Sequence, residues 1–516
     1  MTVSGAHIEP EPLTVIVLAA GEGTRMKSPS RPKVLHAFAG RSLLGHVLAA
    51  TEGLAAEIIA VVIGHHRDQV AEHLHQIAPK AIPVVQAEQN GTGHAVRVAL
   101  AEIARKVRPV TGTVLVLPGD APLLTPATLA GLLAEHAAAR AAATLLTSVV
   151  ADPTGYGRII RSPGFPDRVD RVVEHRDASP AELLIGEVSA LVYAFDAELL
   201  WNAVNRLSTA NAQGEEYLPE VVSILVGEGQ LVLARRAPAW EAAGVNDRVQ
   251  LATAHRAYNA RLLEQHMRAG VTVIDPATTW LDAGVVIGPD TTLHPNVQLH
   301  GATRIAGDAV IGPDSTLTDT EVGAGSVLHR TVANQARIGA GVTVGPYAYL
   351  RPGTVLADRA HIGTYVEVKA SEIGAGSKVP HLSYVGDATI GEHTNIGAAT
   401  VFVNYDGVHK HRSTVGNHAR TGADNMFIAP VAVGDGAYTA AGSVIASDVP
   451  AGALGVGRAR QRNVAGWVLR RRAGTAAAHA AEQAGAAQPR HDAKVDRPAA
   501  TEASAMEPEG RGSIQP

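Results

Sequence analysis

The sequence predicts two folded domains in series: an α/β domain on a mostly parallel sheet, followed by a parallel β-helix. From about residue 13 to 247, short β-branched runs alternate with Ala- and Leu-rich stretches, which is typical of helices that cover a parallel sheet. From about residue 286 to 445, one aliphatic residue recurs every six positions. We therefore expect an α/β domain over 13–247, a linking helix over 248–269 and a repeat domain over 270–467.

Length and composition exclude several classes of protein. A chain of 516 residues exceeds one ordinary core, and 46% hydrophobic with 18% charged residues indicates globular domains. A net charge of −5 argues against a surface built throughout for nucleic acid, and the absence of cysteine excludes thiolate chemistry. No signal peptide and no membrane-spanning apolar run is evident, so we expect a cytoplasmic protein without nucleic-acid or membrane partners.

The first domain contains the predicted strands and helices in alternation. The runs TVIVLAA, AEIIAVVIG, AIPVVQA and GTVLVLPGD predict buried strands. Helices are expected at Leu43–Ala56, Gly93–Lys106 and Pro126–Ala143, and a longer one at Asp247–Ala269. Ligands of such a sheet bind at the carboxyl ends of its strands.

A glycine-rich turn follows the first strand in the segment LAAGEGTRMKSPSRPK. Gly21 and Gly23 let backbone N–H groups approach an anion, and Arg25 and Lys33 add the positive charge that neutralises a triphosphate. The spacing fits neither a Walker A loop nor the dinucleotide fingerprint. A plain turn is the alternative for the glycines alone, but the full combination predicts a phosphate-binding loop.

Two further segments supply groups for a nucleotide and a metal. Gln86 and Gly91–Thr92 have amide and backbone groups that could read a base edge. Asp120 ends an apolar run, where a carboxylate is suited to hold Mg²⁺ against phosphate oxygens. A helix cap is the alternative role for a single aspartate, but Asn246–Asp247 offers a second oxygen ligand and favours the metal.

The six-residue period predicts flat strands that complete a coil in three faces. Its aliphatic positions point inward and stack on their equivalents, while Gly, Pro, Asp and Asn occupy the corners. A glycine-rich loop region is the alternative, and it would not keep the period for so long. The repeating positions are Ile287, Leu293, Leu299, Ile305, Ile311 and Leu317, and then Ile338, Val344, Leu350, Leu356, Ile362 and Val368. After Trp467 the composition predicts a disordered tail over 468–516.

Seven segments of the first domain resemble the sugar-nucleotide pyrophosphorylases: LAAGEGTRM, PKVLH, QAEQNGTGHAV, GDAPLL, GYGRI, VVEHRDA and GVNDRVQL. Joined to hexapeptide repeats, the chain is similar over residues 13–467 to the bifunctional N-acetylglucosamine-1-phosphate uridylyltransferases/glucosamine-1-phosphate acetyltransferases. The resemblance implies a Rossmann-like nucleotidyltransferase domain, a left-handed parallel β-helix and a homotrimer. It also implies that acetyl-CoA acetylates glucosamine 1-phosphate, and that the resulting N-acetylglucosamine 1-phosphate reacts with UTP on Mg²⁺ to give UDP-N-acetylglucosamine and pyrophosphate for cell-wall precursors.

The resemblance also implies residue roles. For UTP and the product they are Leu18, Ala19, Gly21, Gly23, Arg25, Lys33, Gln86, Gly91, Thr92, Gly157, Glu174, Ser189 and Asn246, with Asp120 and Asn246 on Mg²⁺. For the amino sugar phosphate they are Arg351, Lys369, Tyr384 and Asn395, and for acetyl-CoA Asn404, Tyr405, Ala423, Ala441 and Arg458. His381 would be the general base, which suits an imidazole whose ordinary pKa is near 6.5.

The chain departs from that family at a few positions. Ser189 and Leu191 replace an asparagine and a glycine, Glu216 and Pro219 replace an aromatic residue and a threonine, and Ala423 replaces a serine. We expect these changes to weaken or redirect the activities. Two alternatives stay open: only one activity is retained, or the chain is a trimeric sugar-nucleotide-binding scaffold without turnover. A metal site of His361, His409 and His411 is disfavoured because no carboxylate partner is evident.

Overall fold

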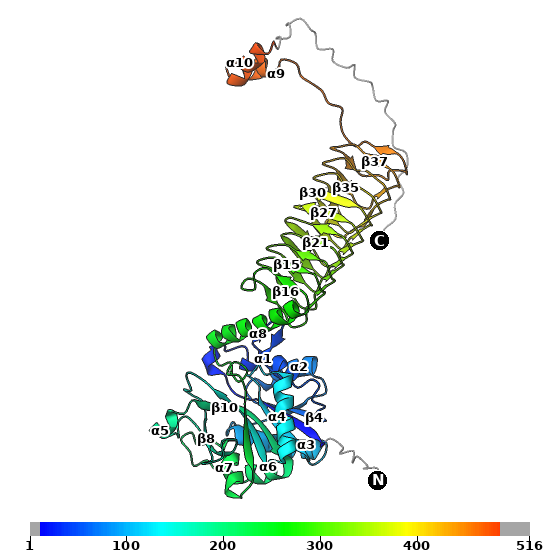
Figure 1. Cartoon of the computed structure of the whole chain (residues 1–516). Helices are drawn as coiled ribbons and strands as arrows, with labels where there is room; N and C mark the ends of the chain where they lie inside the picture. Colours follow the sequence, from blue (N-terminus) through cyan, green and yellow to red (C-terminus); the bar gives the residue numbers. More distant parts are fainter. Residues whose placement is uncertain (1–10, 486–516) are drawn as a thin grey trace, which may run out of the picture. The chain divides into compact units, whose positions relative to one another are not determined.

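The computed structural model describes residues 11–485, and its first part is a sheet with helices on both faces (Figure 1). The path through the sheet is β11-β7-β10-β6-β1-β4-β5. The four predicted strands are present and mutually parallel, which confirms the Rossmann-like α/β domain. They are β1 (Leu13–Ala19), β4 (Ile58–Ile63), β5 (Ile82–Val85) and β6 (Thr113–Pro118).

One long strand breaks the parallel pattern. β10 (Glu187–Asp196) runs antiparallel to β6 and to β7 (Ala143–Val149), and β11 (Val232–Arg236) closes that edge parallel to β7. The register between β10 and β7 shifts between Ser189 and Tyr193. β8 (Arg158–Arg161) and β9 (Val169–Val173) form a hairpin beside β10. A small hairpin of β2 (Ala37–Phe38) and β3 (Arg41–Ser42) lies apart from this sheet.

Helices bury an apolar core on each face of the sheet. One core contains side chains of α3 (Thr92–Lys106), α6 (Ala197–Val204) and α7 (Glu220–Gly227). The other contains side chains of α1 (Leu43–Ala50), α2 (Arg67–Ile77) and α4 (Pro126–Ala139), and the short α5 is Pro180–Leu183. The predictions for α1 and α4 were too long at their C-terminal ends. In α4 the reason is Arg140, whose left-handed φ of 47° ends the helix before β7.

The predicted linking helix is α8 (Arg248–Arg268), and Asp247 caps its N-terminus by accepting a hydrogen bond from Gln250 N at 2.8 Å. Asn259, buried on α8, is bonded to the first coil of the repeat region. Its Nδ2 donates to Thr279 O at 2.7 Å, and its Oδ1 accepts from Leu281 N at 2.9 Å. The helix is thereby fixed to the beginning of the coil.

The repeat region is a parallel β-helix with three faces, as predicted. Face 1 consists of β12 (Thr272–Val273), β15 (Thr292–Leu293), β18 (Val310–Ile311), β21 (Val327–Leu328), β24 (Thr343–Val344), β27 (His361–Thr364) and β30 (Lys378–His381). Face 2 consists of β13 (Trp280–Leu281), β16 (Gln298–His300), β19 (Thr316–Thr318), β22 (Thr331–Asn334), β25 (Ala348–Leu350), β28 (Glu367–Lys369), β31 (Tyr384–Gly386), β33 (Val401–Val403), β35 (Met426–Ile428) and β38 (Val444–Ile445).

Face 3 and a final pair of strands complete the coil. Face 3 consists of β14 (Val286–Ile287), β17 (Arg304–Ile305), β20 (Glu321–Val322), β23 (Arg337–Ile338), β26 (Val355–Leu356), β29 (Glu372–Ile373), β32 (Ala388–Ile390), β34 (Ser413–Val415) and β36 (Ala432–Val433). β37 (Tyr438–Thr439) pairs in parallel with β39 (Leu454–Gly455).

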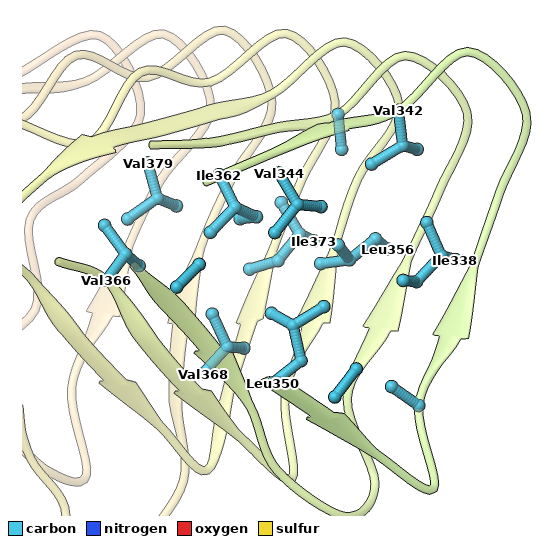
Figure 2. Packing of buried hydrophobic residues seen from close by; sticks show 14 of the residues in the cluster. Ile338, Val342, Val344, Leu350, Leu356, Ile362, Val366, Val368, Ile373 and Val379 are labelled. Atoms are coloured by element: carbon cyan, nitrogen blue, oxygen red, sulfur yellow. The ribbon is translucent and has the colours of Figure 1, made fainter. Parts of the chain in front are cut away.

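Every residue of the predicted aliphatic series is buried in one continuous core. Figure 2 shows part of this core, with Val344, Ile362 and Val379 stacked from coil to coil. The series was interrupted between Leu317 and Ile338 because some corners there are one residue shorter. Only five positions separate Leu317 from the next residue of the apolar core, Val322, and five separate the inward residues Ala333 and Ile338 of successive faces.

The end of the repeat region differs from its prediction. The compact unit that contains the coil ends at Gly457, and a second unit begins at Arg458. The expected disordered tail contains two short helices, α9 (Trp467–Arg471) and α10 (Ala476–Gln483). Alanine has the highest helix propensity, and Thr475 caps α10 through its side chain, which explains why this polar segment is helical. The remainder of the predicted tail, 486–516, lies outside the described residues. No helix among residues 11–485 is both long and apolar enough to cross a membrane.

Candidate active sites

A cavity of about 310 Å³ lies at the carboxyl ends of the central strands of the first domain. Eight residues expected to bind nucleotide or metal line it: Leu18, Ala19, Gly21, Lys33, Gln86, Gly91, Thr92 and Asp120. These residues come from four separate segments of the chain. Their convergence supports the interpretation of this edge of the sheet as a ligand site.

The expected phosphate and metal residues form one polar cluster. Lys33 Nζ is ion-paired with Asp120 and donates a hydrogen bond to Asn246 Oδ1 at 2.8 Å. A guanidinium nitrogen of Arg25 donates to the same oxygen of Asn246 at 2.8 Å. Asp120 is not the helix cap that was the alternative, because Thr125 caps α4. The oxygens of Asp120 and Asn246 therefore converge on one position.

Two glycines have conformations that a side chain would disfavour. Gly23 has a φ of 66°, and a Cβ there would collide with the Cβ of Lys33. Gly91 has a φ of 104° and precedes α3, and a Cβ there would collide with the backbone of Glu216. Substitution of either glycine would therefore displace a loop that borders the cavity.

The residues expected to read the base are held by one another. Gln86 is buried, and its Nε2 lies 3.1 Å from both Gly91 O and His94 Nδ1. Thr92 Oγ1 accepts a hydrogen bond from Leu218 N at 3.0 Å. These bonds orient the amide of Gln86 and fasten the start of α3 to the segment before α7.

The expected sugar residues are neighbours on the hairpin and on β10. Ser189 N donates to Gly157 O at 2.9 Å, and a Cβ on Gly157 would lie 3.3 Å from Glu174 Oε1. Burial raises the pKa of Glu174, with a smaller contribution from the negative charge of Asp177. The carboxylate of Glu174 is therefore poorly solvated. This is what we expect of a carboxylate that accepts a hydrogen bond from a sugar hydroxyl in place of water.

Four of the residues that depart from the family have defined contacts or conformations in the first domain. The Ser189 hydroxyl lies 3.0 Å from the Tyr193 hydroxyl and accepts from Leu191 N at 3.2 Å, so its bonds are internal to the strand. Leu191 has a left-handed φ of 56° and lines the cavity. Glu216 forms a bidentate pair with Arg97, the shortest distance being 2.7 Å. Pro219 precedes α7 as its N-cap residue.

Sequence reasoning missed two polar side chains of the cavity, Gln89 and Glu215. Gln89 Nε2 donates to Ala20 O at 2.9 Å and so fastens the base-reading loop to the phosphate loop. Gln89 lies in the segment QAEQNGTGHAV, and Glu215 directly precedes Glu216. The contact between Gln89 and Ala20 spans 69 positions, and no local sequence pattern carries such a signal.

The expected acetyltransferase residues lie mainly along face 2 of the coil. Arg351 pairs with Glu367 at 2.7 Å. Lys369 pairs with Asp387 at 2.9 Å, and Asn404 Nδ2 donates both to Asp387 and, at 3.4 Å, to the Tyr384 hydroxyl. The hydrogen bond that Lys369 donates to Asp387 raises the pKa of Lys369. Asp387 is a further residue that sequence reasoning missed.

His381 is exposed at the end of β30, one residue before the corner at Leu382 and three before Tyr384. Tyr405 is exposed in the loop after β33, and Asn395 lies in a backbone bridge between coils. Ala423 and Ala441 lie on successive coils, with Gly442 N donating to Ala423 O at 2.8 Å. Arg458 belongs to the second unit.

One expectation about the histidines was wrong. His411 Nε2 lies 2.7 Å from Asp406 Oδ2, so it has the carboxylate partner that the sequence did not reveal. Asp406 also accepts from the backbone of His409 at 2.6 Å, which shapes the loop rather than a metal site. Within residues 11–485, no group of three or more His, Cys, Asp or Glu side chains is arranged to hold a metal.

The fold and its two polar regions define a class of protein, a nucleotidyltransferase joined to a hexapeptide-repeat transferase. Residues 15–182 match the family of MobA-like NTP transferase domains. The bifunctional protein GlmU of Streptomyces avermitilis is 57% identical over 92% of this chain and 97% of its own length. Those of Kineococcus radiotolerans and Thermobifida fusca are 53% and 56% identical, over 94% and 92% of this chain and 98% and 97% of their own lengths. The chain belongs to the GlmU family of bifunctional enzymes.

Proposed function

We propose that this enzyme makes UDP-N-acetylglucosamine in two steps, at two separate sites. In the first, acetyl-CoA acetylates glucosamine 1-phosphate on the β-helix. In the second, N-acetylglucosamine 1-phosphate reacts with UTP in the α/β domain. The observation that carries the proposal is the convergence of Arg25, Lys33, Asp120 and Asn246 beside a cavity that Gln86 and Thr92 also line.

In the uridylyl step, an oxygen of the sugar 1-phosphate attacks the α-phosphorus of UTP, and pyrophosphate leaves as the new P–O bond forms. No protein nucleophile is required. The site aligns two polyanions and reduces their repulsion, which Lys33, Arg25 and the backbone N–H groups of the glycine-rich loop are suited to do. Glu174 and Gly157 would bind the acetylamino sugar.

The donor set at Asp120 and Asn246 fits Mg²⁺. One carboxylate and one amide oxygen converge there, and Mg²⁺ prefers a few protein oxygens completed by phosphate oxygens and water. When bound, the ion would neutralise charge on the phosphates. Lys33 contacts both of these residues, so its ammonium group would move toward the phosphates when the site is loaded.

In the acetyl step, the glucosamine nitrogen attacks the thioester carbonyl carbon, the C–S bond breaks and coenzyme A leaves as the thiol. His381 would remove the proton from the nitrogen. Arg351 and Lys369 would bind the sugar phosphate, and Tyr384 and Asn395 would orient the sugar. Asn404, Tyr405, Ala423, Ala441 and Arg458 would contact acetyl-CoA.

We also propose a homotrimer that packs on face 2. The outward residues Val332, Tyr349, Met426 and Val444 of this face are 40–49% exposed. On face 3 the equivalent positions include Arg304, Glu321, Arg337 and Glu372, which are suited to water. The exposed positions of His381 and Tyr405 also favour a site that a neighbouring subunit completes.

We propose that the enzyme acts in the cytoplasm, because its proposed substrates acetyl-CoA and UTP are metabolites of that compartment.

The test is one reaction with purified protein, Mg²⁺, glucosamine 1-phosphate, acetyl-CoA and UTP, analysed by mass. UDP-N-acetylglucosamine is the expected product. Release of coenzyme A without this product would mean that only the acetyl step is retained. Failure to release coenzyme A, with product formed from added N-acetylglucosamine 1-phosphate, would leave only the uridylyl step. Binding of the sugar nucleotide without turnover in either assay would favour the scaffold.

A further inference from the structure

We propose that Asp387 is the positioning residue of the C-terminal site and links the group that binds the sugar phosphate to a group that binds the acetyl donor. This inference rests on the proposed roles of Lys369 and Asn404. Asp387 itself has no role in the reaction described above. Its carboxylate is the one group that touches both side chains among the residues that the structure describes.

The geometry is that of a shared acceptor. Lys369 Nζ lies 2.9 Å from one oxygen of Asp387 and 3.1 Å from the other, and Asn404 Nδ2 donates to the nearer one. Lys369 belongs to β28, whereas Asn404 directly follows β33, two coils further along face 2. Asp387 is the acceptor that Lys369 and Asn404 share, so its carboxylate holds the ammonium group and the amide together across these coils.

The backbone around Asp387 is built for this contact. Asp387 has a left-handed φ of 49°, and its N–H donates to Lys369 O at 3.0 Å. Gly386 is buried, and a Cβ there would collide with the Tyr384 hydroxyl and lie 2.8 Å from Asn404 Nδ2. The glycine therefore leaves room for the amide to reach the carboxylate.

The charge of Asp387 is maintained at working pH. Burial alone would raise the pKa of this carboxyl, but the hydrogen bonds from Lys369 and Asn404 outweigh burial and hold the pKa below its ordinary value. A charged acceptor bonds an ammonium group and an amide more strongly than a neutral one does. When a sugar phosphate binds, the lysine has one anion on each side and keeps its position between them.

The test compares Asp387→Asn and Asp387→Ala with the matched control Asp358→Asn in the full-length protein. Asp358 Oδ1 also accepts a hydrogen bond, from Ala340 N at 2.8 Å, but at a corner outside the cluster. We expect both Asp387 variants to raise the KM for glucosamine 1-phosphate and the KM for acetyl-CoA by about tenfold, the effect of losing one charged hydrogen bond. The control should change neither constant.

Two readouts separate positioning from general damage. Uridylyl transfer to added N-acetylglucosamine 1-phosphate should remain within about twofold of the unmodified enzyme, and the thermal midpoint of Asp387→Asn should match that of Asp358→Asn. The inference is wrong if a folded Asp387→Asn protein keeps both KM values, or if only one of them rises. An unmodified enzyme that acetylates nothing would instead refute the proposed acetyltransferase.

If Asp387→Ala does not fold, the double variant Asp387→Asn/Asn404→Ala keeps the inference testable. Asp387→Asn and Asn404→Ala each remove the same contact. The effect of the double variant on the KM for acetyl-CoA should therefore be smaller than the sum of the effects of the two single variants. Strictly additive effects would mean that Asp387 does not act through Asn404, and would overturn the link.

Discussion

Leu191 adopts a backbone conformation that a branched side chain disfavours, with a φ of 56° at the irregular part of β10. A left-handed conformation costs a residue with a Cβ about 1 kcal/mol or more, and Leu191 also narrows the cavity that it lines. We expect Leu191→Gly to raise kcat/KM for N-acetylglucosamine 1-phosphate several-fold in a uridylyl assay, because the pocket widens.

Arg140→Gly is the matched control for that substitution. Arg140 has a φ of 47° at the end of α4 and is exposed, so the change relieves the same kind of strain outside the cavity. It should raise the thermal midpoint and leave kcat/KM unchanged. An unchanged or lower kcat/KM in a folded Leu191→Gly enzyme would show that the leucine does not limit sugar binding.

Glu174 gives the α/β domain a defined dependence on pH. Burial raises its pKa above the ordinary 4.5, so the folded state holds the proton more tightly than the unfolded state does. The free energy of unfolding therefore falls as pH rises from about 4.5 through the raised pKa. Glu174→Gln should remove this decrease and increase stability at neutral pH, while it weakens sugar binding. Denaturant titrations across pH 4–8 would check it, and an identical pH profile in both proteins would contradict it.

At the scale of elements, α8 depends on one buried amide. Asn259 bonds Thr279 O and Leu281 N, and both backbone groups belong to the first coil. Asn259→Ala leaves these two buried groups without a partner, at a cost of about 3 kcal/mol. A lower thermal midpoint is expected, measured beside Gln265→Ala, which changes an exposed residue of the same helix. Equal midpoints for the two variants would show that the coil does not need this anchor.

The elements that the sequence predicted are those with a local signal. Inward aliphatic residues such as Leu293 and Ile362 were identified because burial on a three-faced coil repeats every six positions. The interruption after Leu317 hid the next coils, since a corner shortened by one residue shifts the period without changing the packing. The pattern of inward aliphatic residues thus predicts the strands. The number of residues at each corner does not follow from that pattern and is known only from the structure.

The candidate sites show the same limit. Lys33, Asp120 and Asn246 could be proposed because each lies in a recognisable segment, and the structure joins residues 213 positions apart. The pair of Arg97 and Glu216 has no local signal, since 119 positions separate the two partners. Asp387 was overlooked for a different reason. A lone aspartate at a coil corner is typical of a turn, and only its contacts reveal another role.

At the scale of the whole molecule, we expect the two activities to need different assemblies. The cavity proposed for uridylyl transfer is lined by residues of the α/β domain, from Leu18 to Glu215. The proposed acetyl site lies on an open surface, with His381 exposed beside face 2. Packing the apolar side chains of face 2 against a neighbouring subunit would remove them from water. Such burial stabilises an assembly by roughly 25 cal/mol for each Å² of apolar surface. The uridylyl step should therefore be independent of the proposed trimer, and the acetyl step should depend on it.

Val332→Glu/Tyr349→Glu tests this difference, because charges in the centre of an apolar interface oppose association. Light scattering should show monomers in place of trimers, with acetyl transfer lost and uridylyl transfer retained. Arg304→Glu is the control on face 3, where an exposed charge is merely reversed, and it should leave both assembly and activities unchanged. Trimers that persist in the double variant would place the interface on another face. Monomers that still transfer acetyl groups would show that one chain contains the complete site. Loss of acetyl transfer together with loss of the trimer is expected only if a neighbouring subunit supplies part of the site.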